Sequence, residues 1–185
     1  GHASYRWSLF NQLSQQGYDV DFIGGKFGIN GNPPLYSNFD QDHEGHSGWR
    51  ADEILANVVS FVTANRPDIV LFQIGTNDIS QGQSNTSTIN EISATIDNIR
   101  SVVANVKILL ATAIPFPSFA AQTADLNSRI TALAPQKNTA QSPVILVDLF
   151  TGMSSSDLYD GVHPNDSGER KIANKFLAAL QPILP

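Results

Sequence analysis

Short apolar runs that alternate with amphipathic segments constrain the fold of this chain most. The run at 68–74 reads Asp-Ile-Val-Leu-Phe-Gln-Ile and is apolar almost throughout, as is typical of a strand buried on both faces of a parallel sheet. Similar runs at 20–23, 107–114 and 144–150 predict three further strands. The alternation therefore predicts an α/β fold, in which helices cover both faces of a parallel sheet.

The segments beside these strands carry apolar residues three or four positions apart, the spacing that places them on one face of a helix. Folds of this kind normally open on a strand, commonly the central one, whereas this chain opens on a helix. We therefore expect the sequence to begin in the middle of a strand–helix unit. The predicted helices span 4–16, 50–64, a segment through Ile89 and Ile99, 119–134 and 166–181, and long loops occupy 26–46 and 75–86.

The composition limits the classes of function. A chain of 185 residues, 41% of them hydrophobic, is long enough for one domain with a sizeable core, and we expect a single domain over 1–185. The net charge of −6 without a basic run argues against a nucleic-acid partner. No apolar run approaches the ~20 residues that span a bilayer, so we expect no membrane partner. Low charge and abundant Ser, Thr, Asn and Gln lead us to expect a secreted, extracellular protein.

Asp160 and His163 lie three residues apart, just before the last predicted helix. Histidine exchanges protons near neutral pH, and a carboxylate on its other ring nitrogen fixes the tautomer and stabilises the imidazolium. Asp166 and Glu169 then fit a variant of the capping box at the start of the helix. In the alternative interpretation, Asp160 caps a turn and His163 is an ordinary loop histidine, because short motifs often occur by chance.

Gly75-Thr76-Asn77-Asp78 directly follows the most apolar strand, and the carboxyl ends of parallel strands are where such folds build their sites. Gly75 allows a close backbone approach, and the Asn77 amide can donate a hydrogen bond to a developing oxyanion. The alternative is a plain turn, for which Gly, Asn and Asp are the usual residues.

His43 and His46 lie in a loop with the acids Asp40, Asp42 and Glu44 nearby. The pair allows a metal site, but no regular helix frames it and no third ligand has the spacing for it. The sequence therefore favours a site without metal.

Ser47, Gly48 and Trp49 follow in the same loop. Ser47 partly matches the nucleophile elbow G-x-S-x-G, ahead of the acid and the histidine, but Trp49 replaces the last glycine and no predicted strand precedes the serine. Gly48 instead offers a backbone N–H near the start of the next helix, a favourable place for an anion. Loop packing around Trp49 is the remaining alternative.

Three blocks in this order resemble those of the SGNH (GDSL-type) hydrolase family. Gly75–Asp78 resembles its third block and Asp160–His163 its last block. Residues 43–49 resemble the second-block region of the branch called carbohydrate esterase family 3, and the opening Ser4-Tyr5-Arg6 with the segment 17–24 resembles that branch too. Each block alone is a weak signal, but the resemblance runs over essentially the whole chain.

The resemblance implies a three-layer α/β/α, flavodoxin-like sheet with strand order 2-1-3-4-5. It implies His163 as the general base and Asp160 as the acid that orients it. Gly48 would supply its backbone N–H, and Asn77 its side-chain amide, to the oxyanion hole. The implied reaction removes acetyl groups from a polysaccharide such as xylan, or from a small ester, without metal or organic cofactor.

The family's first block, a strand that ends in Gly-Asp-Ser and carries the nucleophile, has no counterpart in 1–185. Its place would be just before Ser4, so the resemblance implies that the central first strand is missing from the given chain and that the strands at 20–24 and 68–74 each lack a partner. We expect a separate N-terminal peptide, a neighbouring chain or a rearranged edge to fill the gap. The absent serine leaves a second function open, that of a non-catalytic carbohydrate-binding protein on the same scaffold.

Overall fold

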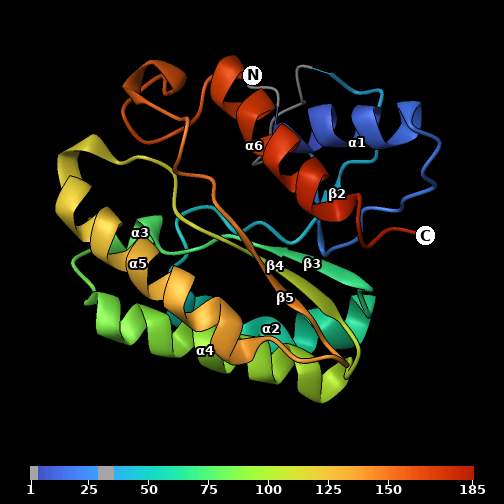
Figure 1. Cartoon of the computed structure of the whole chain (residues 1–185), viewed down its shortest axis with the longest axis horizontal. Helices are drawn as coiled ribbons and strands as arrows, with labels where there is room; N and C mark the ends of the chain where they lie inside the picture. Colours follow the sequence, from blue (N-terminus) through green and yellow to red (C-terminus); the bar gives the residue numbers. More distant parts are fainter. Residues whose placement is uncertain (1–3, 29–35) are drawn as a thin grey trace. The chain divides into compact units, whose positions relative to one another are not determined.

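The computed structural model describes residues 4–28 and 36–185 (Figure 1). They fall into two compact units, Gly1–Ser47 with Met153–Pro185, and Gly48–Gly152, and each unit is described by itself. The predicted α/β class is confirmed, since parallel strands alternate with helices along the chain. The single domain expected over 1–185 stays a prediction.

The sheet of the unit Gly48–Gly152 has three parallel strands in the order β3-β4-β5. Ile69 lies opposite Lys107 at the start of one pair, and Ile108 lies opposite Val144 at the start of the other. The apolar runs therefore predicted the places of these strands correctly, although each strand is shorter than its run. Their order agrees with the last three strands of the order that the resemblance implies. The strands are β3 (Ile69–Phe72), β4 (Lys107–Ala111) and β5 (Val144–Val147).

Helices α2 (Ala51–Asn65), α4 (Asn85–Val102) and α5 (Ala120–Lys137) lie together on one face of this sheet (Figure 1). A one-turn 3₁₀ helix, Pro117–Phe119, precedes α5. The predicted loop 75–86 is wrong in part, because it contains the short helix α3 (Thr76–Ser80). A large part of the core of this unit is aliphatic and comes from α4, β4 and α5: Ile92, Ile96, Ile99, Ile108, Leu109, Leu110, Leu126, Ile130 and Leu133.

The other unit is built on helices α1 (Tyr5–Gln15) and α6 (Asp166–Leu180), which pack against each other. The Tyr5 and Phe176 rings lie 5.4 Å apart between them. The buried aliphatic residues of the pair are Leu9, Leu13, Ile172, Leu177 and Leu180. No helix in 4–28 or 36–185 is long and apolar enough to cross a membrane.

The predicted strand at 20–23 is wrong. A strand exists only through hydrogen bonds to a neighbouring strand, and among the described residues nothing pairs with this segment. The Phe22 N–H donates instead to Oδ2 of Asp40, at 2.7 Å. The predicted loop 26–46 contains a small antiparallel pair, β1 (Lys26–Phe27) and β2 (Asp42–His43), and its part 29–35 lies outside the described residues.

The capping box predicted at the start of α6 is also wrong. Asn165 is the N-cap residue, and its Oδ1 accepts hydrogen bonds from the N–H groups of Ser167 (3.0 Å) and Gly168 (3.2 Å). Glu169 accepts a hydrogen bond from the backbone N–H of Tyr5, the first residue of α1. The N–H groups of the first turn of a helix have no partner inside that helix. Glu169 therefore provides an acceptor for the N-terminus of α1 rather than for that of α6.

Candidate active site

Asp160 and His163 form a hydrogen-bonded pair at the tip of a loop. The Oδ2 of Asp160 lies 2.8 Å from Nδ1 of His163, and Oδ1 accepts the backbone N–H groups of Val162 (3.0 Å) and His163 (2.8 Å). These hydrogen bonds, first that from the His163 N–H, lower the pKa of Asp160 to about 2. The acid is therefore a carboxylate at neutral pH, and a carboxylate at Nδ1 directs Nε2 toward a reacting group.

The loop that carries this pair closes on itself. Leu158 bridges to Pro164 in an antiparallel sense, and the Tyr159 N–H donates to the carbonyl of His163 at 3.0 Å. The side chain of His163 is 63% exposed, and its Nε2 makes no hydrogen bond within the described residues. The loop thus leaves Nε2 of His163 open, while Asp160 holds Nδ1.

Asp157 anchors the base of this loop to α6. It ends the one-turn 3₁₀ helix Ser155–Asp157 and is only 2% exposed. Its carboxylate accepts hydrogen bonds from Lys171 Nζ (2.8 Å), the Ser154 N–H (2.9 Å) and Ser167 Oγ (2.9 Å). The Lys171 ammonium, followed by the Ser154 N–H, lowers the pKa of Asp157 to about 2. A buried carboxylate with charged and neutral donors rigidifies the segment on which the loop stands.

Asn77 and Gly48 lie in the unit Gly48–Gly152. Asn77 is in the first turn of α3, and its Nδ2 donates one hydrogen bond to the carbonyl of Trp49, at 2.9 Å. Gln81 Nε2 donates to the carbonyl of Gly48, at 3.0 Å. The carbonyls of Gly48 and Trp49, directly after the Gly48 N–H in the chain, are thus both held.

The donors that remain open on this segment match an oxyanion hole. Gly48 adopts the left-handed backbone conformation, with φ of 81°, and its N–H donates to no described residue. An asparagine amide has two N–H bonds, so Asn77 keeps one donor beyond the bond to Trp49. The two groups predicted from the sequence are therefore held by one local network with donor capacity to spare.

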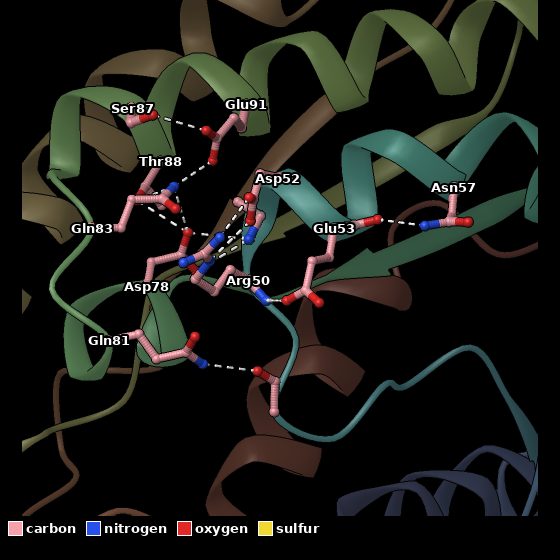
Figure 2. Close-up of polar contacts among 12 residues, drawn as sticks. Arg50, Asp52, Glu53, Asn57, Asp78, Gln81, Gln83, Ser87, Thr88 and Glu91 are labelled. Carbon is pink, nitrogen blue, oxygen red and sulfur yellow. Dashed lines mark hydrogen bonds and ion pairs between the residues drawn. The ribbon is translucent and has the colours of Figure 1, made fainter.

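Asp78, next to Asn77 in the chain, is surrounded by hydrogen-bond donors (Figure 2). It is fully buried and accepts hydrogen bonds from the Ala51 N–H (3.1 Å), Gln83 Nε2 (3.0 Å) and Thr88 Oγ1 (3.2 Å). Burial raises the pKa of Asp78, and the Ala51 N–H opposes that rise. Ala51 is the first residue of α2, so Asp78 fixes the start of α2 to α3. In the block Gly75–Asp78 the asparagine is thus the candidate functional residue, and the aspartate is structural.

The histidines of the 43–46 loop are engaged with neighbouring groups. His46 Nε2 lies 2.7 Å from Oε1 of Glu44, and His43 Nδ1 accepts the Gly45 N–H at 3.0 Å. Burial, followed by the nearby charge of Arg6, lowers the pKa of His43 to about 4. Within 4–28 and 36–185, no group of three or more acidic or histidine side chains is arranged to hold a metal ion.

The other serine candidate, Ser47, is exposed and lies in a turn. Helix α2 begins only at Ala51, so the abrupt strand-to-helix turn of a nucleophile elbow is absent at this serine. The sequence interpretation missed two residues that contact the candidate residues: Gln81, which contacts Gly48, and Tyr159, which contacts His163. No periodic or motif signal marks either one, because their roles depend on the shape of the loops.

The parallel sheet and the two groups of candidate residues can be compared with known protein families. Residues 8–171 match the GDSL-like lipase/acylhydrolase family. The chain belongs to this family of SGNH-type ester hydrolases, and its fold is that of the family.

Similar solved structures agree with this family assignment. A carbohydrate esterase family 3 protein from Talaromyces cellulolyticus is 32% identical, with a TM-score of 0.92 over 98% of this chain and 91% of that one. An acetyl esterase variant, in which a serine is replaced by alanine, was solved with an acetate ion and is also 32% identical, with a TM-score of 0.91 over 98% of this chain and 91% of that one.

A multidomain esterase from Ruminococcus flavefaciens is 30% identical over 98% of this chain. The chain spans 27% of that relative's length. The relative's other regions therefore have no counterpart in these residues.

Proposed function

We propose that this chain provides the general base and the oxyanion donors of a serine esterase that removes acetyl groups from carbohydrate. The observation that carries the proposal is the hydrogen bond between Asp160 and Nδ1 of His163, which leaves Nε2 open at an exposed loop tip. The acetyl esterase and carbohydrate esterase relatives support the choice of acyl group and of substrate class.

In this reaction Nε2 of His163 accepts the proton of a serine hydroxyl while the serine oxygen attacks the acetyl carbonyl carbon. The carbonyl oxygen becomes an oxyanion, and the Gly48 N–H and the second Asn77 N–H stabilise it. The imidazolium, stabilised by the Asp160 carboxylate, then returns the proton to the leaving sugar oxygen. Water repeats the cycle on the acetyl-enzyme, releasing acetate and restoring the serine.

The nucleophile in this proposal is a serine on a strand outside residues 1–185. Two observations support it. Within the described residues the apolar segment 20–23 has no pairing strand, and Ser47 lacks the strand-to-helix turn that activates a serine. A separate N-terminal peptide or a neighbouring chain would supply both the strand and the serine, and secretion would bring the enzyme to its polysaccharide substrate.

The experiment is covalent labelling of the natural full-length protein with a fluorophosphonate that reacts with activated serines. We expect mass spectrometry to locate the adduct on a serine outside 1–185, and we expect His163→Ala to abolish labelling while Ser47→Ala leaves it unchanged. An adduct on Ser47 would refute the proposed location of the nucleophile.

The rival functions give different outcomes. Saturable binding of xylan without labelling or ester cleavage would identify a carbohydrate-binding protein. A metal-dependent deacetylase that uses the 40–46 loop would lose its activity with a chelator, whereas a serine esterase keeps its activity.

A further inference from the structure

Few contacts hold the imidazole ring of His163, although the proposed proton transfer requires the ring to keep a defined orientation. The hydrogen bond to Asp160 holds Nδ1, but the two side chains are 63% and 40% exposed. Exposed ion pairs contribute little and are screened by salt. A catalytic group needs its orientation held within ~10–20° by neighbours, and one solvent-exposed hydrogen bond does not restrict rotation of the ring about that bond.

Tyr159 supplies a second restraint. Its ring lies 5.6 Å from the imidazole, centroid to centroid, and the two planes are within 21° of parallel. This is the offset-stacked geometry that aromatic pairs favour. Among the described residues, Asp160 and Tyr159 are the only ones that contact the His163 side chain through a hydrogen bond, ion pair or ring contact. Asp160 fixes the position of Nδ1, and Tyr159 fixes the plane of the imidazole ring.

The backbone holds Tyr159 in place for this contact. Its N–H donates to the carbonyl of His163 at 3.0 Å, and the adjacent residue Leu158 bridges to Pro164. The tyrosine and the histidine are thus paired across the neck of the loop as well as through their rings. Because Tyr159 is 50% exposed, its ring is not part of the buried core, and core packing does not explain its position.

We infer that Tyr159 is a positioning residue for His163, and that its ring both sets the plane of the imidazole and stabilises the imidazolium that forms during acetyl transfer. The inference rests on the proposed role of His163 as the general base. A cation within ~6 Å of an aromatic centroid is attracted to the face of the ring, so the contact strengthens when the histidine takes up a proton. Stabilisation confined to that state raises kcat rather than substrate binding.

The test compares Tyr159→Leu, which keeps apolar bulk but removes the aromatic ring, with Tyr159→Phe, which keeps the ring but removes the hydroxyl. In the full-length enzyme we expect Tyr159→Leu to lower kcat by about three- to tenfold, the range for one aromatic pair, with KM unchanged. We expect Tyr159→Phe to match the wild type. The matched pair separates the effect of the ring from that of the hydroxyl.

An NMR measurement tests the contact without any need for activity. The Tyr159 ring current should shift the Cε1–H and Cδ2–H resonances of His163 upfield. We expect that shift to disappear in Tyr159→Leu and to persist in Tyr159→Phe.

Several outcomes would overturn the inference. Unchanged resonances and unchanged kcat in Tyr159→Leu would show that the rings do not act together. A raised KM with unchanged kcat would make Tyr159 a substrate contact instead. In both cases His163→Ala is still inactive, so the proposed function survives. Full activity of His163→Ala would instead refute the proposed function, and the positioning role with it.

Discussion

At the scale of single residues, the hydrogen bonds around Gly48 and Asn77 decide which N–H donors stay open at the candidate site. Asn77 uses one N–H to hold the carbonyl of Trp49, and Gln81 holds the carbonyl of Gly48. The Asn77 side chain is therefore held in place before a substrate binds, with its second N–H still open. Such preorganised donors stabilise a developing oxyanion without the cost of reorienting solvent.

In the proposed mechanism, Asn77 donates a hydrogen bond that acts mainly in the transition state. We expect Asn77→Ala to lower kcat by about 10²–10³-fold, or about 2.7–4 kcal/mol, with a small change in KM. Steady-state kinetics on an acetyl ester measure both constants. Asn57→Ala is the matched control, because Asn57 makes a similar side-chain hydrogen bond, to the carbonyl of Glu53 on α2; an equal loss in both variants would exclude an oxyanion role for Asn77.

Asp78 is expected to matter for stability. Asp78→Ala leaves the buried Ala51 N–H without its acceptor, and an unsatisfied buried polar group costs about 1–3 kcal/mol. Chemical denaturation should show this loss in the free energy of unfolding. Asp52→Ala, which removes an exposed ion pair with Arg50, should change stability little, and a similar effect of both substitutions would contradict the structural role given to Asp78.

Four candidate site residues could be named from the sequence, because two short motifs contain three of them and the 43–49 loop contains the fourth; their roles stay predictions. It did not reveal Tyr159 or Gln81. Their contacts are to a histidine ring and to a backbone carbonyl, and such contacts depend on loop geometry rather than on periodicity.

At the scale of elements, α6 connects the histidine loop to α1. Glu169, in the first turn of α6, accepts the Tyr5 N–H at the start of α1. Burial raises the pKa of Glu169 to about 8, although the Tyr5 N–H opposes the rise. One of the contacts between the two helices therefore involves a carboxyl group with a raised pKa.

The sign of the resulting pH dependence follows from that pKa. Glu169 titrates near its ordinary value of 4.5 when the chain is unfolded and at about 8 when it is folded, so its contribution to stability is present below pH 4.5 and is lost as the pH rises through 8. The folded pKa of His43 is about 4, against an ordinary value of 6.5. Its contribution to stability therefore increases as the pH rises from about 4 to 6.5.

We therefore expect the wild-type free energy of unfolding to fall between pH 6.5 and pH 8.5, where His43 no longer contributes. Glu169→Gln keeps an acceptor for the Tyr5 N–H but cannot titrate, so this fall should become smaller. Denaturant titrations of both proteins at the two pH values measure the difference. Equal falls in the two proteins would contradict the assignment to Glu169.

Gly168 allows α6 to approach the segment that bears the histidine loop. A Cβ at this position would lie 2.4 Å from the carbonyl oxygen of Asp157 and 2.8 Å from Cβ of Pro164. We expect Gly168→Ala to lower both the unfolding midpoint and kcat, even though alanine favours a helix by about 1 kcal/mol. Asn174→Ala, at an exposed position of the same helix, should affect neither, and an unaffected Gly168→Ala enzyme would contradict the close approach.

The elements that the sequence predicted well share one property. Strands β3, β4 and β5 are continuous apolar runs, and the isoleucines of α4 recur at helical spacing, so burial alone identifies them. The five-residue helix α3 is too short for a periodic signal. The predicted strand at 20–23 failed because strand formation depends on a partner, which a local apolar run does not reveal.

At the scale of the whole molecule, the alternation of strands and helices predicted the α/β class, and the family match over 8–171 agrees with it. Each candidate half-site is ordered within its own compact unit. The Asp160–His163 pair belongs to the unit with α1 and α6, and the open donors of Gly48 and Asn77 belong to the unit with the parallel sheet.

The release of acetate from acetylated xylan is the measurement that tests this account most directly, with wild-type protein and His163→Ala compared side by side. The account predicts that the natural full-length wild type releases acetate and that the His163→Ala enzyme does not. Acetate release at equal rates by both proteins would contradict it, because the proposed mechanism has no other group to carry the serine proton.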